Sequence, residues 1–435
     1  MFAYYLRLAV LSLKRNKVLT GLMVAAIGLG IGASMTSLTV FYLMSGNPIP
    51  HKNDVLFVPQ LDNWSPNQPF DEPNEPPNML TYRDSMAILE SKQAKRVAIT
   101  FTNFFPVEPE NKEIKPEMVT SRLTTGDFFA MFETPFKYGG GWSAQQESDD
   151  ARVVVLSKAT NEKFFGGADS VGKRLRIDGA EFTVTGVLDD WQPTPKFFDI
   201  TGGPFAENED VYMPFRYGIE KELQSSSNNN CWKDAGEGYQ AWLESECVWL
   251  IGWVELESGA DHDRFLGWMN DYVGEQKKLG RFPRPLNNRL DNVGQWLENQ
   301  KVVRRDTSVQ VALSFGFLAV CLINTVGMLL AKFLGRSGEI GLRRALGASK
   351  RQVFAQYLTE AGMVGVAGGV LGLLLAWLGL AGVRQLYGEF ERLSQLDVPM
   401  VLTAIGLAIA SAIVAGLLPT WRACQVAPAV QLKSH

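Results

Sequence analysis

Four long stretches of the sequence contain no charged residue. They are Val18–Met44, Thr307–Ala331, Ala361–Val383 and Val398–Trp421, with lengths of 27, 25, 23 and 24 residues. A helix of about 20 apolar residues crosses the hydrocarbon core of a bilayer. A buried helix of a globular domain rarely stays uncharged over that length, so the pattern predicts four transmembrane helices.

The segment between the first two stretches has the mixed pattern of a globular domain, in which β-branched and aromatic runs alternate with turn signals. The strand candidates are Ala151–Leu156, Arg174–Ile177, Phe182–Leu188 and Trp249–Leu256. Lys158–Phe165 predicts a short helix, and Asp178-Gly179 is typical of a hairpin turn. We therefore expect an α-helical membrane protein with four transmembrane helices. A large mixed α+β extracytoplasmic domain of two lobes is inserted between helices 1 and 2.

The charged residues indicate the orientation of these helices. Residues 1–17 contain four basic residues and no acidic residue. Residues 332–360 contain six basic and two acidic residues, and residues 422–435 contain two basic residues and no acidic residue. In contrast, residues 45–306 contain 28 basic and 41 acidic residues, and residues 384–397 contain two and three. Basic connecting segments stay in the cytoplasm. The sequence therefore predicts cytoplasmic termini and an outer location for both acidic segments.

These patterns give a plan for the whole chain. Residues 2–16 predict an amphipathic helix at the cytoplasmic interface, with an early start of the first transmembrane helix as the alternative. The first apolar run is too long for a signal peptide and lacks a clear cleavage site. The expected segments are a cytoplasmic amphipathic helix (1–17), transmembrane helix 1 (18–44), a periplasmic domain (45–306), transmembrane helix 2 (307–331), a cytoplasmic loop (332–360), transmembrane helix 3 (361–383), a short periplasmic loop (384–397), transmembrane helix 4 (398–421) and a cytoplasmic tail (422–435).

Residues with metal-binding or catalytic chemistry are sparse. Cys231 and Cys247 both fall in the outer domain, where an oxidising compartment would allow a disulfide, and two free thiols are the alternative. The three histidines and four cysteines form no cluster with metal-ligand spacing, so no metal site is expected. No G-x-S-x-G nucleophile motif is present, which disfavours a membrane-anchored enzyme. The acidic outer domain also disfavours nucleic-acid binding.

Two glycine patterns raise separate questions. Gly167, Gly172 and Lys173 match the first positions of a phosphate-binding loop, but Arg174 stands where Ser or Thr would bind Mg²⁺, and a strand is expected to follow. An ATP site is therefore not expected there. GxxxG pairs occur in the first and third apolar stretches: Gly28 with Gly32, Gly365 with Gly369, and Gly368 with Gly372. This spacing lets helices approach closely, either within the chain or between copies.

The segment 332–360 carries the most informative motif. Glu339–Leu346 fits a short helix with Leu342 and Leu346 on one face. Gly347 is a suitable helix stop, and Ser349 with Gln352 forms a potential capping box for the next helix. A stop-transfer loop needs only positive charge, so this order of residues indicates a further role.

Three parts of the chain resemble a known family, the ABC-transporter permeases of the MacB/FtsX/LolC-LolE group. Glu339–Val353 (EIGLRRALGASKRQV) is similar to the signature loop of that family, and Pro419–Pro428 with Leu432 is similar to its C-terminal ending. Val153–Leu188 resembles its MacB-like periplasmic core domain. Together with the positions of the apolar stretches, the resemblance extends over nearly the whole chain.

The resemblance implies a non-catalytic permease subunit of the bacterial inner membrane that forms dimers, homomeric or heteromeric, and binds an ABC ATPase subunit. ATP and Mg²⁺ would be bound by that ATPase, which we expect to be a separate polypeptide because only 17 residues precede the first apolar stretch. A periplasmic adaptor and an outer-membrane channel are further partners in this group. The ATPase-coupling candidates are Glu339, Gly341, Leu342, Arg343, Arg344, Leu346 and Gly347.

Two functions follow from the resemblance. The first is efflux or extraction of a substrate, driven by motions of the periplasmic domain, and the size of that domain favours it. The alternative is an FtsX-like regulator that transmits motion to a periplasmic enzyme and transports nothing.

Overall fold

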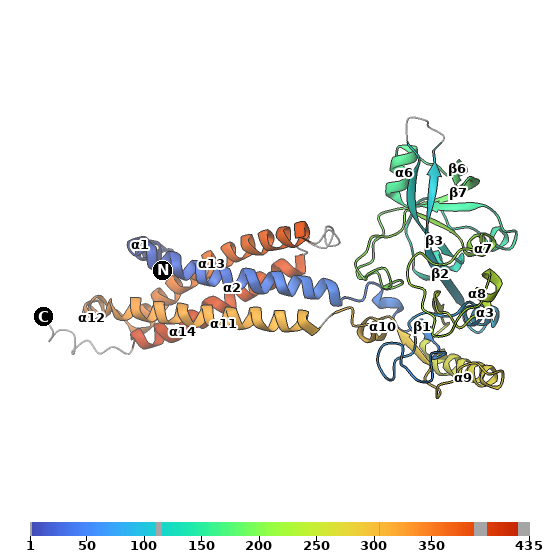
Figure 1. The fold of residues 1–435 in the computed structure, drawn as a ribbon. Helices are drawn as coiled ribbons and strands as arrows, with labels where there is room; N and C mark the ends of the chain where they lie inside the picture. The colour runs from blue at the N-terminus through green and yellow to red at the C-terminus, as the bar shows by residue number, and fades with distance from the viewer. Residues whose placement is uncertain (1, 110–114, 304, 387–397, 425–435) are drawn as a thin grey trace. The chain divides into compact units, whose positions relative to one another are not determined.

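The computed structural model describes residues 2–109, 115–303, 305–386 and 398–424. The chain forms two compact units (Figure 1): a helical unit, Met1–Ser45 with Val303–His435, and a mixed unit, Gly46–Val302. Most of the predicted loop 384–397 and of the predicted tail 422–435 lies outside the described residues.

The helical unit consists of long apolar helices and two shorter ones. The helices are α1 (Phe2–Arg15), α2 (Lys17–Ser45), α11 (Arg305–Leu334), α12 (Ser337–Ala345), α13 (Lys350–Leu386) and α14 (Val398–Cys424). Within the described residues, α2, α11, α13 and α14 are long and apolar enough to cross a membrane. The predicted fold class, with four such helices and a mixed domain between the first two, is confirmed.

The four long helices pack as a bundle. α13 packs against α2 and α14, and α11 packs against the same two helices. α1 packs against α13. At the end of the bundle where α12 lies, α1 and α12 both run across the direction of the long helices (Figure 1).

The mixed unit contains ten strands and eight α-helices among its described residues. The strands are β1 (Leu56–Gln60), β2 (Arg96–Glu108), β3 (Glu117–Thr124), β4 (Phe136–Gly139), β5 (Val153–Leu156), β6 (Arg174–Ile177), β7 (Ala180–Leu188), β8 (Val211–Pro214), β9 (Ile251–Glu255) and β10 (Arg289–Asn292). The helices are α3 (Tyr82–Glu90), α4 (Asp127–Met131), α5 (Ala144–Ser148), α6 (Lys158–Phe165), α7 (Phe215–Glu220), α8 (Tyr239–Glu244), α9 (His262–Lys278) and α10 (Val293–Asn299). Short 3₁₀ turns occupy Pro50–Lys52 and Gly259–Asp261.

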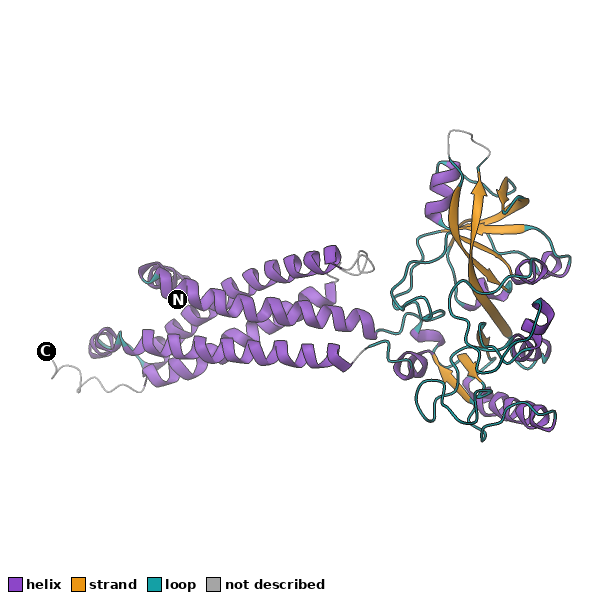
Figure 2. Cartoon of the chain, in the orientation of Figure 1, coloured by secondary structure: helices purple, strands orange, loops and turns teal. Residues whose placement is uncertain are grey.

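A single sheet runs through the mixed unit (Figure 2). Its order is β10-β1-β9-β2-β3-β8-β5-β7-β4, and β6 pairs with both β2 and β7. The expected two lobes are therefore not separated by a break in the sheet. β2 is antiparallel to β3 and also pairs with β9 near its first residues and with β6 near its last residues. With 13 residues, β2 is long enough to reach both strands.

Several predicted elements of the mixed unit match the structure. α6 and β6 have the predicted bounds, and β7 begins two residues earlier than expected. β6 and β7 form the predicted hairpin, and Asp178 and Gly179 at its turn have φ angles of +50° and +71°. Positive φ at both turn positions matches the twist of the flanking strands.

An aromatic cluster fills the mixed unit beside β9. Phe132 lies edge-on to Trp253, with ring centroids 5.6 Å apart, and Phe197 does the same at 5.5 Å. The indole nitrogens of Trp253 and Trp296 donate hydrogen bonds to the carbonyls of Phe198 and Phe197. Edge-on aromatic pairs stabilise a core beyond the area they bury, so these rings fix the β7–β8 connection to the sheet.

Candidate functional site

The segment 332–360 is helical for most of its length. α11 continues to Leu334 and α13 begins at Lys350. α12 lies between them and begins two residues before the predicted start at Glu339. The segment therefore consists of the end of α11, the short helix α12 and the start of α13, joined by two short turns. The position of α12 depends on the ends of these two long helices.

The turn between α12 and α13 has the local chemistry that the sequence predicts. Gly347 has a φ of +101°, a conformation that glycine adopts without strain. Ser349 Oγ accepts a hydrogen bond from the backbone N–H of Gln352 at 3.3 Å. Gln352 Oε1 accepts one from the N–H of Ser349 at 2.9 Å. This reciprocal pair is a capping box, and it fixes the start of α13.

One face of α12 is packed into the bundle. Ile340 is buried in a cluster that includes Phe333 of α11 and Val353 and Tyr357 of α13. Gly341 is buried beside it. These contacts anchor α12 to both neighbouring helices.

The opposite side of this segment exposes two leucines, one within α12 and one directly after its last residue, Ala345. Leu342 is 56% exposed and Leu346 is 81% exposed. Full burial of a leucine side chain contributes about 1.5–3 kcal/mol. Another protein that covered this face would therefore gain binding energy.

The charged candidates on α12 are held within the chain. Arg343 Nη2 forms an ion pair with Glu339 Oε1 at 2.8 Å, one helical turn away. Arg343 Nη1 donates to Gln356 Oε1 of α13, also at 2.8 Å. Arg344 is partly buried in the last turn of α12. The Arg343 guanidinium thus braces α12 against α13 and leaves the leucines as the most prominent groups.

A buried charged cluster lies next to α12. The side chain of Lys332 in α11 and that of Glu360 in α13 are 0% and 1% exposed and form an ion pair at 2.5 Å. Ser12 of α1 donates to the same Glu360 oxygen, and Arg336 donates to Ser12. Both residues lie just outside the uncharged stretches 307–331 and 361–383, and the pair is included because α11 and α13 extend beyond those stretches.

All six glycines of the GxxxG pairs face another helix of the same chain. Gly28, Gly32, Gly368 and Gly372 lie between α2 and α13, and Gly365 and Gly369 lie between α13 and α14. A Cβ atom added to Gly365 would lie 2.1 Å from Cβ of Ala412. At these positions a larger side chain would force the helices apart.

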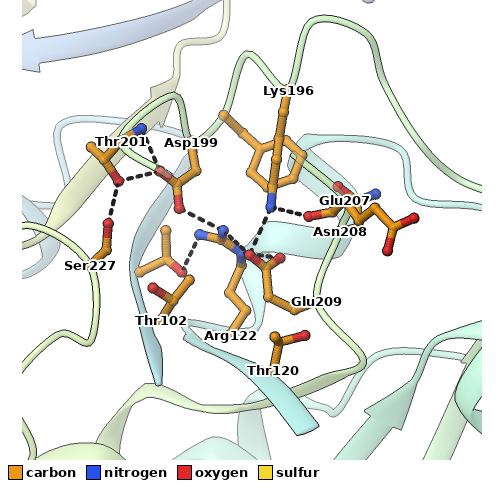
Figure 3. A network of polar contacts seen from close by, with 12 residues as sticks. Thr102, Thr120, Arg122, Lys196, Asp199, Thr201, Glu207, Asn208, Glu209 and Ser227 are labelled. Carbon is orange, nitrogen blue, oxygen red and sulfur yellow. Dashed lines mark hydrogen bonds and ion pairs between the residues drawn. The ribbon is translucent and has the colours of Figure 1, made fainter. Parts of the chain in front are cut away.

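A second buried charged cluster lies in the mixed unit (Figure 3). Arg122 of β3 is fully buried and donates to both carboxylate oxygens of Glu209, at 2.9 and 2.6 Å, and to Asp199 at 2.7 Å. Lys196 donates to Glu209 at 2.8 Å. Two cations and two carboxylates thus balance. Because Lys196, Asp199 and Glu209 all belong to the β7–β8 connection, the cluster ties that connection to β3.

The electrostatics of this cluster favour its ionised form. Burial raises the pKa of Glu209, but the nearby charges of Arg122 and Lys196 outweigh that effect and lower it to about 2. Burial lowers the pKa of the Arg122 guanidinium, but Glu209 and Asp199 outweigh it, so that this pKa is raised. All four charges have partners, so the arrangement indicates a structural role rather than an acid–base one.

The disulfide candidate lies beside a third charged cluster. Cys231 and Cys247 form a disulfide with their Cα atoms 4.3 Å apart. Arg281 forms ion pairs with Asp84 at 2.9 Å and with Glu246 at 2.5 Å. Because Glu246 precedes Cys247 in the chain, the disulfide and the ion pairs hold the same loop.

A cavity of about 880 Å³ lies among α3, α5 and α7. Its apolar lining includes Met86 and Phe215, and its acidic lining includes Glu90 and Glu147. Burial raises the pKa of Glu147, although a hydrogen bond from the backbone of Gly126 opposes the shift. Among the described residues that line it, Ser148 donates its hydroxyl to the carbonyl of Gln145 and not to a carboxylate.

The stretch that resembles a phosphate loop has a different structure. Gly166 and Gly167 have φ angles of +64° and +77° and end α6. Lys173 leads directly into β6 and not into a helix. No helix N-terminus is available there to bind a phosphate.

Several residues of these sites escaped sequence-based prediction. Lys332 and Glu360 are the first charged residues beyond two of the uncharged stretches, which is the one local signal that could have identified them. Ser12 and Arg122 have no local signal, since their partners lie 348 and as many as 87 residues away.

Two family models match the chain. Residues 20–265 match the MacB-like periplasmic core domain. Residues 311–428 match the FtsX-like permease C-terminal domain. The first match covers more than half of the chain, and the second includes α12.

Individual relatives align with more than two thirds of the chain. The macrolide export ATP-binding/permease protein MacB of Azoarcus sp. (strain BH72) is 26% identical over 73% of this chain and 43% of that protein. The pyoverdine export ATP-binding/permease protein PvdT of Pseudomonas entomophila (strain L48) is 25% identical over 83% of this chain and 49% of that protein. The chain spans about half the length of the curated relatives it matches.

The solved structures to which the chain shows similarity include the periplasmic region of MacB from Actinobacillus actinomycetemcomitans. The two share 11% sequence identity with a TM-score of 0.37, over 58% of this chain and 95% of that chain.

Proposed function

We propose a function for this chain on the basis of its family, the ABC-transporter permeases that combine a MacB-like periplasmic core domain with an FtsX-like permease domain, to which it belongs. In this function the chain couples ATP hydrolysis by a partner ATPase to motions of its mixed unit. In this proposal α12 is the coupling helix that contacts the ATPase. The observation that carries it is the two-faced character of α12, which is anchored through Ile340 and exposes Leu342 and Leu346.

The proposed topology follows from the charge distribution. In this proposal the basic segments 1–17, 332–360 and 422–435 all lie on the cytoplasmic side, together with α12, and the acidic mixed unit lies in the periplasm. A cytoplasmic α12 would be within reach of an ATPase. ATP and Mg²⁺ would be bound by that partner.

We propose export as the activity, either from the periplasm or from the outer leaflet of the inner membrane. Two relatives are named exporters, of a macrolide and of pyoverdine, which favours export over the regulation of a periplasmic enzyme. The transporter would contain two permease chains, identical or related, and a periplasmic adaptor and an outer-membrane channel are further proposed partners.

Purification of the full-length chain from its native membranes tests the coupling role. The eluate should contain an ATPase subunit and hydrolyse ATP. A Leu346→Asp variant should lose both, because it places a charge in the apolar contact while leaving the packed face of α12 unchanged. The double charge reversal Arg343→Glu/Arg344→Glu should also lose the ATPase.

The matched control is Leu279→Asp, which changes a leucine of similar exposure (72%) in the mixed unit. This variant should retain the ATPase. Full retention of the ATPase by Leu346→Asp would exclude α12 as the coupling helix.

A further inference from the structure

The charged cluster beside α12 joins four elements of the helical unit. Lys332 in α11 and Ser12 in α1 both contact Oε1 of Glu360 in α13, each at 2.5 Å. Arg336, which directly precedes α12, donates to Ser12 Oγ at 2.5 Å. We call Ser12, Lys332, Arg336 and Glu360 the buried joint.

Because Lys332 and Glu360 are buried, the free energy lost in removing their charges from water offsets much of the attraction between them. Both Lys332 and Glu360 lie within helices that are apolar enough to span a membrane, where ionisable groups are rare and commonly functional. Removing two charges from water costs several kcal/mol per ion, and apolar residues of similar volume often stabilise a protein equally well or better. The pair therefore requires an explanation other than stability.

The geometry of the joint supplies that explanation. α11 and α13 each pack mainly against α2 and α14, so at this end Lys332 and Glu360 link two helices across the bundle. The Glu360 oxygen that pairs with Lys332 also accepts a hydrogen bond from the Ser12 hydroxyl, and Ser12 Oγ in turn accepts one from Arg336. A displacement of α12 would thus act on Arg336 and pass through Ser12 to Glu360.

The rest of α12 is attached to the same helices in a different way. Ile340 is packed against Phe333 and Tyr357, whose ring centroids lie 4.4 Å apart. Arg343 donates a hydrogen bond to the Gln356 side chain. The middle of α12 therefore follows α13, while its N-terminal end is connected to α1 through a directional chain of polar contacts. Apolar packing alone would let α1 slide, because it has no angular preference.

We propose that the buried joint transmits displacement of α12 to α1 and α13, and that Glu360 is its central positioning residue. This inference rests on the proposed role of α12 as the coupling helix. It assigns to α1 a part in coupling, which the similarity to other permeases does not provide.

The test uses the full-length chain in complex with its ATPase, in nanodiscs. Spin labels at Lys14→Cys on α1 and Val366→Cys on α13, in a Cys321→Ser/Cys424→Ser background, report the distance between the two helices with and without ATP. Both labelled side chains are exposed. The wild-type joint should show an ATP-dependent shift of this distance.

The decisive variant is Lys332→Met/Glu360→Met, which removes both charges together. It should melt at the same temperature as the wild type or higher, since neither Lys332 nor Glu360 is left buried without its partner, and should bind the same amount of ATPase. The ATP-dependent shift should be lost. The single variant Glu360→Met should melt at a lower temperature, because Lys332 is left buried without its partner.

The control is Ser34→Ala, which removes another interhelical hydrogen bond, from Ser34 Oγ to the Ser314 carbonyl. This variant should keep the ATP-dependent shift. An unchanged shift in the double methionine variant would overturn the inference, as would a wild-type complex that binds ATPase and shows no shift. A wild-type chain that binds no ATPase would instead refute the proposed function itself.

Discussion

Arg122 is held entirely inside the mixed unit, where its guanidinium balances Glu209 and Asp199 (Figure 3). Removing one member of a buried ion pair leaves an uncompensated charge, which typically costs about 3–5 kcal/mol. We therefore expect Arg122→Met to lower the free energy of unfolding by about that amount, measured by urea denaturation of the full-length chain and followed by tryptophan fluorescence.

Arg174→Met is the control for this variant. Arg174 forms an ion pair with Glu181 in which both side chains are about two-thirds exposed, and such pairs contribute little to stability. Equal urea midpoints for Arg122→Met and Arg174→Met would contradict the burial of Arg122 between Glu209 and Asp199.

The low pKa of Glu209 predicts a dependence of stability on pH. Its pKa is lowered from 4.5 to about 2 in the folded chain, since Arg122 and Lys196 outweigh the effect of burial. A lowered pKa contributes stability that is fully present above about pH 4.5 and is lost as the pH falls toward 2. The urea concentration at the midpoint of unfolding should therefore decrease as the pH is lowered from neutral to about 3. In Glu209→Gln, which starts from a lower midpoint, this decrease should be smaller; an identical decrease would assign the acid sensitivity to other carboxylates.

At the scale of elements, α13 depends on glycine where it meets α14. A methyl group on Gly365 would collide with Ala412, at 2.1 Å, whereas one on Gly362 in the same helix would meet no atom within 4 Å. Overpacking commonly costs about 1–3 kcal/mol. Gly365→Ala should thus lower the thermal midpoint in detergent, followed by circular dichroism, and Gly362→Ala should leave it unchanged or raise it. The reverse order would contradict the observed contact.

The loop near α8 depends on its disulfide. Cys231 and Cys247 are 16 residues apart in sequence, and a disulfide that closes a loop of this length contributes about 3 kcal/mol in the chain-entropy description. The double variant Cys231→Ser/Cys247→Ser should lose stability of this order in urea denaturation. Reductant should produce the same loss in the wild type and none in the variant.

At the scale of the whole molecule, the chain connects the two units near Ser45 and Val302. The mixed unit has its own sheet and its own buried core. Residues 46–302 expressed alone should therefore fold cooperatively, with the disulfide formed and the buried tryptophans giving a near-ultraviolet circular dichroism signal. A molten fragment without that signal would show that the helical unit is needed for its folding.

Local chemistry made much of this architecture predictable. The turn at Asp178-Gly179, the break at Gly347 and the cap at Ser349 were predicted because each depends on the conformational preferences of one or two neighbouring residues. The four membrane-spanning helices were predicted for a similar reason, since an uncharged run is a property of consecutive residues. The candidate contact face of α12 was predicted only in part, because helical spacing pairs Leu342 with Leu346 but does not reveal that Arg343 is held by Gln356.

Local patterns in the sequence were enough to predict the four helices that, among the described residues, are long and apolar enough to cross a membrane. They also predicted the mixed domain between the first two of these helices and the glycine break after α12. Which buried charges meet depends instead on how the chain packs. Ser12 contacts Glu360 across 348 residues, and Arg122 contacts Glu209 across 87. Such pairs depend on helix packing and strand register, which bring distant residues together, and their energies depend on burial that no local pattern encodes.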